Sequence, residues 1–151
     1  MNSNFKDLLL LFTEHEVEYL LVGGYAYMQY AEPRYTKDLD LWVNATPSNA
    51  TRVFTALAKF GAPLGELTIK DFSEPDGVYQ MGIAPFRVDV LLEVSGLTFE
   101  EARINHHQVL IGDIYVPVIS KADLIENKKA AGRPQDLVDV QVLLSDGKKV
   151  K

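Results

Sequence analysis

Residues 21–43, LVGGYAYMQYAEPRYTKDLDLWV, contain the pattern that decides the fold of this chain. An apolar run ends at Gly23 and Gly24, and a second apolar run begins at Asp38. The segment between them reads as a short helix that closes before Pro33, a residue that does not continue helices. This order predicts a strand, a tight turn into a helix, and a return to a second strand.

The second strand carries two aspartates one residue apart, in KDLDLWV (37–43). Side chains alternate along a strand, so the leucines face the core while Asp38 and Asp40 share the other face, about 7 Å apart. Two like charges in such a partly desolvated place repel each other by roughly one to a few kcal/mol. A divalent cation, a nearby Lys or Arg, or water at the strand end can each compensate them.

Length and composition predict a single domain over residues 1–151, because a chain of 151 residues that is 47% hydrophobic can bury roughly two thirds of its unfolded surface. The chain has no cysteine, which excludes disulfides, thiolate metal sites and cysteine nucleophiles and fits a reducing compartment. Its apolar runs are too short to span a bilayer, and none resembles a signal segment. We therefore expect a soluble cytoplasmic protein without a membrane partner.

The charge is unevenly distributed along the chain. The formal net charge of −6 argues against a nucleic-acid coat over the whole surface. Residues 1–120 carry 8 basic and 16 acidic side chains, whereas residues 121–151 carry 7 basic and 5 acidic ones. A polyanion is therefore expected to bind locally, at the C-terminal part or in a cleft.

Periodicity and capping residues predict the remaining elements. Helices are expected at 4–15, 25–31, 49–60 with Ser48 as cap, 98–105, 121–131 and 133–144. Strands are expected at 17–22, 38–44, 78–83 and 86–94, with a hairpin at 107–120, a turn at Ala84 and Pro85, and a weak strand at 67–70. The predicted class is α/β (α+β), a mixed β-sheet with helices packed mainly on one face.

Two further features admit both a functional and a structural explanation. Gly23 and Gly24 lack a Cβ, so their backbone N–H groups can approach an anion at a helix start, but a tight strand-to-helix turn without a ligand also explains them. Asp89 lies in the apolar strand FRVDVLL (86–92), where a lone acid is costly unless it is paired or ligates a metal. Arg87, two residues earlier on the same face, offers an ion pair instead.

Together these residues form an ordered set: a Gly-Gly turn, an Asp-x-Asp strand, and a later single Asp. The set resembles the signature of the DNA polymerase β-like nucleotidyltransferase superfamily. The resemblance covers residues 17–93 and implies that Asp38, Asp40 and Asp89 hold two Mg²⁺ ions, with Mn²⁺ as a substitute, for in-line displacement at phosphorus.

The C-terminal stretch LIENKKAAGRPQDLVDV (124–140) resembles the Lys...Arg-x-x-Asp-x-x-Asp motif of small bacterial nucleotidyltransferase proteins related to AbiEii-type toxins. This resemblance implies that Lys128 and Arg133 contact a triphosphate and that Asp136 and Asp139 orient them. A structural explanation stays open as well, because a lysine near a helix C-terminus and an aspartate in a first turn both suit the helix dipole.

The resemblance implies a minimal nucleotidyltransferase that transfers an NMP from an NTP to a hydroxyl of an acceptor, which is RNA such as tRNA, a protein or a small molecule. Asp89 would then help to deprotonate the attacking hydroxyl, and Gly23 and Gly24 would bind the β and γ phosphates. Arg34 and Thr36 would neutralise or position the phosphates.

Two other hypotheses remain open from the residues alone. One is a catalytically decayed module that binds a nucleotide or a partner protein in a system like a toxin–antitoxin pair. The other is a plain scaffold with an acidic surface patch. A response to Mg²⁺ separates the scaffold from the rest, and transfer of label from an NTP separates an enzyme from a binding module.

Overall fold

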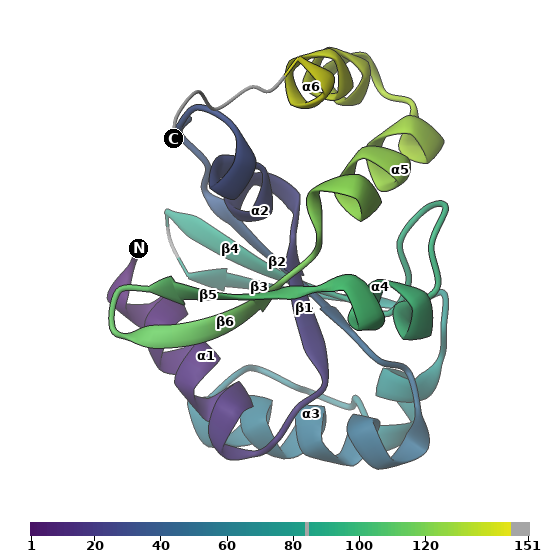
Figure 1. Cartoon of the computed structure of the whole chain (residues 1–151). Coiled ribbons are helices and arrows are strands. Elements are labelled where there is room, and N and C mark those ends of the chain that lie inside the picture. The colour runs from purple at the N-terminus through teal and green to yellow at the C-terminus, as the bar shows by residue number, and fades with distance from the viewer. Residues whose placement is uncertain (84, 146–151) are drawn as a thin grey trace.

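The computed structural model describes residues 1–83 and 85–145, in which one six-stranded sheet is flanked by helices (Figure 1). The strands are β1 (Tyr19–Val22), β2 (Asp38–Val43), β3 (Val78–Ile83), β4 (Phe86–Leu91), β5 (His107–Ile111) and β6 (Ile114–Val118). The helices are α1 (Ser3–Glu14), α2 (Gly23–Tyr30), α3 (Pro47–Phe60), α4 (Phe99–Asn105), α5 (Lys121–Ala131) and α6 (Pro134–Leu144), with a short 3₁₀ helix η1 (Ile69–Ser73).

The sheet is mixed, with the strand order β3-β4-β2-β1-β6-β5. β2 pairs antiparallel with β1 and parallel with β4, and β1 pairs parallel with β6. The two edge strands belong to the antiparallel hairpins β3–β4 and β5–β6, which the alternating sequence pattern predicted. The predicted fold class is confirmed; the predicted turn at Ala84 and Pro85 lies partly outside the described residues, which omit Ala84.

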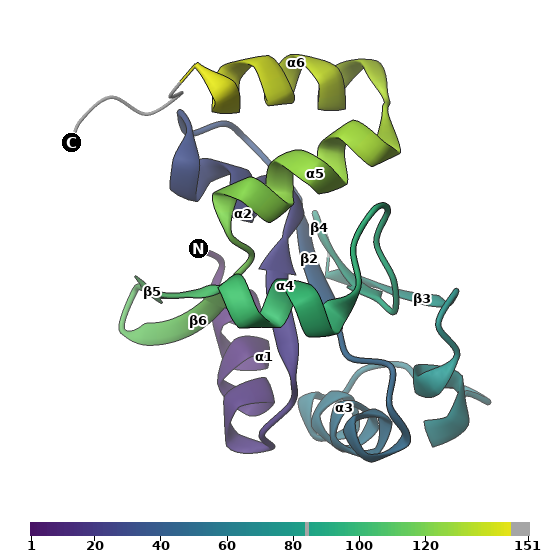
Figure 2. The same cartoon turned by 45° about the vertical axis from the view of Figure 1, so that its right-hand side comes forward.

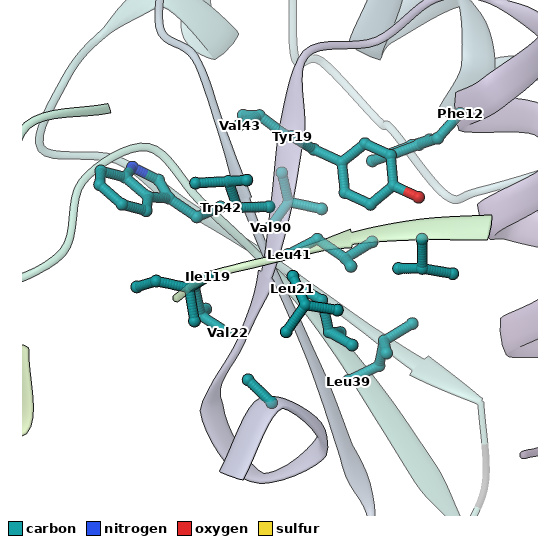
Figure 3. Packing of buried hydrophobic residues seen from close by; sticks show 14 of the residues in the cluster. Phe12, Tyr19, Leu21, Val22, Leu39, Leu41, Trp42, Val43, Val90 and Ile119 are labelled. Carbon is teal, nitrogen blue, oxygen red and sulfur yellow. The ribbon is translucent and has the colours of Figure 1, made fainter. Parts of the chain in front are cut away.

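The central strand β2 separates two apolar layers. Leu39 and Leu41 are fully buried, and Leu41 lies opposite Leu21 of β1 on the face that α1 and α3 cover (Figure 3). Trp42 points to the other face and packs edge-on against Phe99 of α4, with ring centroids 5.3 Å apart. Full burial of each such side chain stabilises the fold by about 1.5–3 kcal/mol, so the face that carries the aspartates is anchored on both sides of the sheet.

Three local predictions were wrong, each for a local reason. Residues 67–70 do not form a strand; Thr68 instead caps the start of η1, where its backbone N–H donates to Asp71 at 2.8 Å. The cap of α3 is Thr46 rather than Ser48, because Pro47 occupies the first helical position that suits proline. α2 begins at Gly23 itself, so both glycines belong to its first turn.

α5 and α6 form a helical pair beyond the sheet. Figure 2 shows α6 running above α5, with α2 beneath α6 and beside α5, at the end of β1. Gly132 ends α5 in the left-handed conformation at φ +67°, which turns the chain back into α6. In the part of the chain that the structure describes, every helix falls short of the length and hydrophobicity needed to cross a bilayer.

Candidate active site

Asp40 and Asp89 lie directly opposite each other on neighbouring strands. The parallel register of β2 and β4 pairs Asp40 with Asp89 and Asp38 with Arg87. Asp89 is buried, and Asp40 is half-buried. Burial, the charges of Asp89 and Asp38, and a hydrogen bond with Asp89 raise the pKa of Asp40 to about 7. The strand pairing therefore concentrates negative charge at one point of the sheet.

Arg87 is the cation that partly compensates this charge. Its Nε and Nη2 donate to the two carboxylate oxygens of Asp89 at 2.9 and 3.1 Å, and Nη2 also reaches Asp38 at 3.2 Å. The ion pair that the sequence offered as a structural explanation is thus present and extends to a second strand. Within residues 1–83 and 85–145, no three His, Asp or Glu side chains are arranged to hold a metal ion.

The start of α2 approaches the same carboxylates. Gly23 has φ +68°, and a Cβ added there would overlap the Asp40 carboxylate, 2.9 Å from its Cγ. A Cβ at Gly24 would lie 3.2 Å from Oγ1 of Thr36. No described side chain caps the first turn, which leaves its backbone N–H groups available to an anion. Only glycine allows this approach at position 23.

An open cleft of about 570 Å³ joins these groups. Its walls include Gly23, all three predicted carboxylates and Arg133. The remaining wall residues are Val22, Arg87, Leu91, Glu93, Val94, Ser95, Asn127 and Ala131. A volume of this size suits a ligand of a few hundred daltons.

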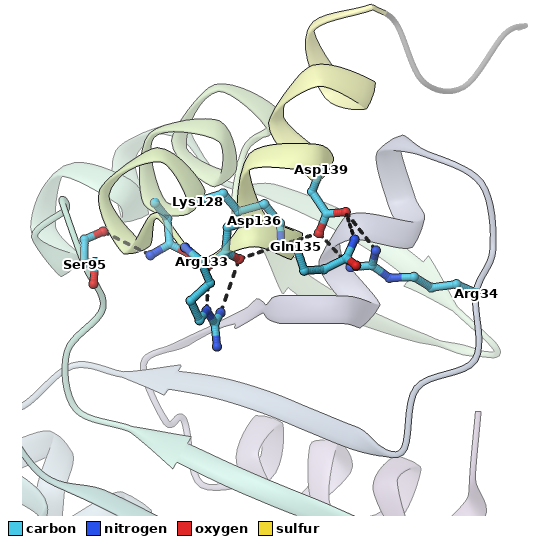
Figure 4. Close-up of polar contacts among 8 residues, drawn as sticks. Arg34, Ser95, Lys128, Arg133, Gln135, Asp136 and Asp139 are labelled. Atoms are coloured by element: carbon cyan, nitrogen blue, oxygen red, sulfur yellow. Dashed lines mark hydrogen bonds and ion pairs between the residues drawn. The ribbon is translucent and has the colours of Figure 1, made fainter.

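Asp139 of α6 is the centre of a buried polar cluster (Figure 4). Arg34 donates to both of its oxygens at 2.9 Å, and Lys128 and Gln135 each donate at 2.8 Å. Burial alone would raise the pKa of Asp139, but the hydrogen bonds from Arg34, Lys128 and Gln135 outweigh it and lower the pKa to about 2. The guanidinium of Arg34 also lies 3.9 Å from the ring centroid of Tyr27, which fixes α2 to the same cluster.

Asp136 holds Arg133 at the edge of the cleft. Its carboxylate accepts from Nε of Arg133 at 2.6 Å and from the Arg133 backbone N–H at 3.2 Å. Lys128 lies 3.6 Å from Asp136 and is buried, whereas the Arg133 side chain is 77% exposed. The two predicted phosphate ligands thus differ in place, because only the arginine presents its charge to solvent.

The predicted site residues do not all meet. Arg34 and Thr36 line a second cavity of about 580 Å³, together with Tyr25, Phe86 and the N-terminal residues 1–4. Sequence reasoning missed Ser95 and Asn127 in the wall of the carboxylate cleft. The Asn127 side chain donates to the Ser95 carbonyl at 3.0 Å and so fixes the loop after β4 to α5. The sequence feature that pointed to this contact is Gly96, because a Cβ at that position would lie 2.7 Å from Cβ of Ala130 in α5.

Comparison with solved structures identifies the fold. The lincosamide antibiotic adenylyltransferase LnuA, solved with lincomycin bound, is 16% identical with a TM-score of 0.64 over 96% of this chain and 97% of its own. ANT(2'')-Ia in complex with adenylyl-2''-tobramycin is 14% identical with a TM-score of 0.63, over 95% of this chain and 82% of its own. A candidate nucleotidyltransferase of Thermotoga maritima is 11% identical with a TM-score of 0.62, over 93% of this chain and 90% of its own.

No protein-family model and no curated protein matches the sequence. The structural likeness, at identities below one in five, shows the fold alone. The chain has the nucleotidyltransferase fold, as predicted from the Gly-Gly, Asp-x-Asp and Asp pattern.

Proposed function

We propose that this protein is a divalent-metal-dependent nucleotidyltransferase that moves an NMP from an NTP to a hydroxyl of an acceptor. One observation carries the proposal: Asp40 and Asp89 meet across β2 and β4 in a cleft that the start of α2 also lines. Carboxylates and free backbone N–H groups in one cleft suit a metal-bound triphosphate. The fold shared with antibiotic-modifying nucleotidyltransferases supports the same assignment.

The residues present fit Mg²⁺ in their chemistry. Asp38, Asp40 and Asp89 are hard oxygen donors, and burial, together with the negative charges of Asp89 and Asp38, raises the pKa of Asp40, a cost that a bound cation would relieve. In the structure the guanidinium of Arg87 forms ion pairs with two of these carboxylates, those of Asp38 and Asp89. When bound, Mg²⁺ neutralises phosphate charge and polarises the α-phosphoryl group.

In the proposed reaction the acceptor oxygen forms a bond to the α-phosphorus. The bond from that phosphorus to the oxygen that bridges the α and β phosphates breaks, and pyrophosphate leaves. Asp89 takes up the hydroxyl proton, and Asp38 and Asp40 would, with Asp89, hold a divalent cation that offsets the charge of the nucleotide's phosphates. Backbone N–H groups of Gly23 and Gly24 bind the β and γ phosphates, where negative charge develops on the leaving group.

The C-terminal cluster positions a phosphate ligand. Arg133 is the candidate for direct contact, since it lines the cleft and is exposed. Lys128 and Arg34 are assigned to positioning, because Asp139 holds both of them. Thr36 packs close to the backbone of Gly24, where an added Cβ would lie 3.2 Å from its Oγ1. Under this assignment Asp136 orients Arg133, while Asp139 fixes α6 to α2.

We infer that the acceptor is a small hydroxyl-bearing molecule. The support is by analogy, since LnuA and ANT(2'')-Ia were solved with lincomycin and an adenylylated tobramycin. A tRNA or protein acceptor, and a partner protein in a toxin–antitoxin pair of the AbiEii type, are the rival proposals that the C-terminal motif suggests. The assay below includes all three acceptor classes.

A second candidate function is nucleotide or partner binding without catalysis. The observation that favours it is the placement of Arg87, whose hydrogen bonds engage both oxygens of Asp89. A permanently paired Asp89 would not accept a proton. Binding of an NTP without transfer to any acceptor would support this second function.

The test is label transfer from α-³²P NTPs in the presence of Mg²⁺ or Mn²⁺. Acceptors are bulk tRNA, cell protein and a panel of aminated and hydroxylated small molecules. We expect transfer to one class, lost in Asp40→Asn and kept in Asp76→Asn, which neutralises an exposed carboxylate. Transfer that survives Asp40→Asn would exclude the proposed active site, whereas no transfer to any class with NTP binding intact would exclude the proposed enzyme.

A further inference from the structure

Arg87 contacts two carboxylates that lie on different strands. Its fork is bidentate on Asp89, two residues along β4, and one nitrogen also reaches Asp38 on β2. The parallel register sets this geometry, because it places Asp38 opposite Arg87 and Asp40 opposite Asp89. The carboxylates of Asp38 and Asp89 are consequently turned toward the arginine rather than toward a shared cation position.

The arginine is free to leave this position without disturbing the core. Its side chain is 46% exposed and lines the cleft, and its long aliphatic stem lets the guanidinium reach toward solvent. The cluster around Asp139 contrasts with it, since Lys128 and Asp139 are buried between α2, α5 and α6. Exposed ion pairs such as Arg87–Asp38 are weak and are easily exchanged. The pair with the buried Asp89 has an exposed cation but a buried anion, so a cation that replaces Arg87 must itself neutralise Asp89.

We propose that Arg87 is a displaceable internal counterion that sets the affinity of the site for divalent cations. In the metal-free protein it donates hydrogen bonds to Asp38 and Asp89 and partly neutralises them. A cation that binds the three carboxylates displaces the guanidinium toward the mouth of the cleft. Arg87 is thus a positioning residue, and the inference rests on the proposed function because it requires the carboxylates to be metal ligands.

A specific consequence separates this role from a structural one. If Arg87 competes with the cation, its removal strengthens cation binding, although the site loses a polar contact. If Arg87 instead fixes the carboxylates in their ligating positions, its removal weakens binding. The sign of the change in affinity therefore decides between competition and support.

The experiment is titration of the full chain with Mn²⁺ alone, with free Mn²⁺ followed by electron paramagnetic resonance and heats by calorimetry. Arg87→Gln is expected to bind Mn²⁺ about tenfold or more tightly than wild type, since charge-assisted hydrogen bonds no longer oppose binding. Arg87→Lys keeps the charge but loses the fork, so we expect an intermediate affinity. The double variant Arg87→Gln with Asp40→Asn should lose the gain, which locates it at this site.

Arg103→Gln is the matched control for general electrostatics. It removes one exposed arginine that lies 3.6 Å from Glu18, away from the cleft, and should leave the Mn²⁺ affinity unchanged. Melting temperatures of all variants verify that they are folded. An equal gain in Arg103→Gln, or equal or weaker binding in Arg87→Gln and Arg87→Lys, would overturn the inference.

These outcomes are distinguishable from a failure of the proposed function. If the wild type transfers an NMP and Arg87→Gln binds Mn²⁺ with the same affinity as the wild type, only the proposed role of Arg87 is excluded. Absence of Mn²⁺ binding in wild type and in Arg87→Gln, with and without an NTP, removes the metal site and both proposals together.

Discussion

Arg34 and Asp139 form a bidentate ion pair across 105 positions of the chain, with both nitrogen–oxygen distances at 2.9 Å. The pair joins the loop before β2 to α6, and Lys128 of α5 donates to the same carboxylate. Three segments that are distant in sequence thus share one buried anion. This connection places the α5–α6 pair, and with it Arg133, against the carboxylate cleft.

Asp139→Asn is expected to destabilise the protein by roughly 2–4 kcal/mol, because it leaves the buried Lys128 and the half-buried Arg34 without their shared anion. Urea denaturation measures this as a lower midpoint with an unchanged slope. Asp76→Asn, an exposed carboxylate in a turn, is the control and should change the free energy of unfolding by less than about 0.5 kcal/mol. Equal effects of the two changes would contradict a structural role for the cluster.

The same carboxylate predicts an acid limit to stability. The pKa of Asp139 is about 2 in the folded protein, below its ordinary value of 3.8, so the unfolded chain takes up the proton first as the pH falls. The stabilisation is therefore fully present above about pH 4 to 5 and is lost progressively toward pH 2. Free energies of unfolding measured between pH 6 and pH 2 should fall more steeply in wild type than in Asp139→Asn. Parallel curves would remove Asp139 as the cause.

Gly23→Ala is expected to cost more than a left-handed glycine ordinarily does. Gly61 serves as the matched comparison, since it also has positive φ, +93° against +68°, but an added Cβ there meets open space. Gly61→Ala should lower the free energy of unfolding by about 1–2 kcal/mol for the backbone conformation alone. Gly23→Ala must in addition displace the Asp40 carboxylate, which raises the cost by roughly 1–3 kcal/mol.

Thermal unfolding in the presence of an NTP and Mg²⁺ provides the second readout for this pair. The ligands should stabilise Gly61→Ala as they do wild type, and they should have no effect on Gly23→Ala. If both alanine variants respond fully to the ligands, the start of α2 is not part of the nucleotide site.

Local patterns allowed the elements around β2 to be predicted from the sequence. The Gly-Gly turn, the period-two strands and the glycines that end α3 and α5 each depend on neighbours within a few residues. The errors were local as well. Pro47 moved the α3 cap to Thr46, and the capping residues of η1 overrode the β-branched composition of 67–70.

Local sequence patterns could not predict the long-range contacts that shape the site. The pairing of Arg87 with Asp38 depends on β2 and β4 being parallel neighbours, which the order of elements along the chain does not determine. The capture of Arg34 by Asp139 likewise depends on where α6 docks. For this reason the sequence did not predict that Arg34 and Lys128 share Asp139, while the phosphate contacts that the resemblance implies for them stay a prediction.

Asp40→Asn should raise the stability of the free protein and abolish its response to ligands. The change removes one of three mutually repelling, partly buried carboxylates, so the metal-free variant is expected to melt roughly 3 °C or more above wild type. Wild type with an NTP and Mg²⁺ at about 100 times the dissociation constant gains about 2.7 kcal/mol, or roughly 5–10 °C. Differential scanning calorimetry of both proteins measures the two effects, with Asp76→Asn as a control that should follow wild type in each. If Asp40→Asn keeps the full ligand-induced increase in melting temperature, the nucleotide binds elsewhere. If the metal-free variant melts below wild type, the charge of Asp40 is already compensated in the free protein.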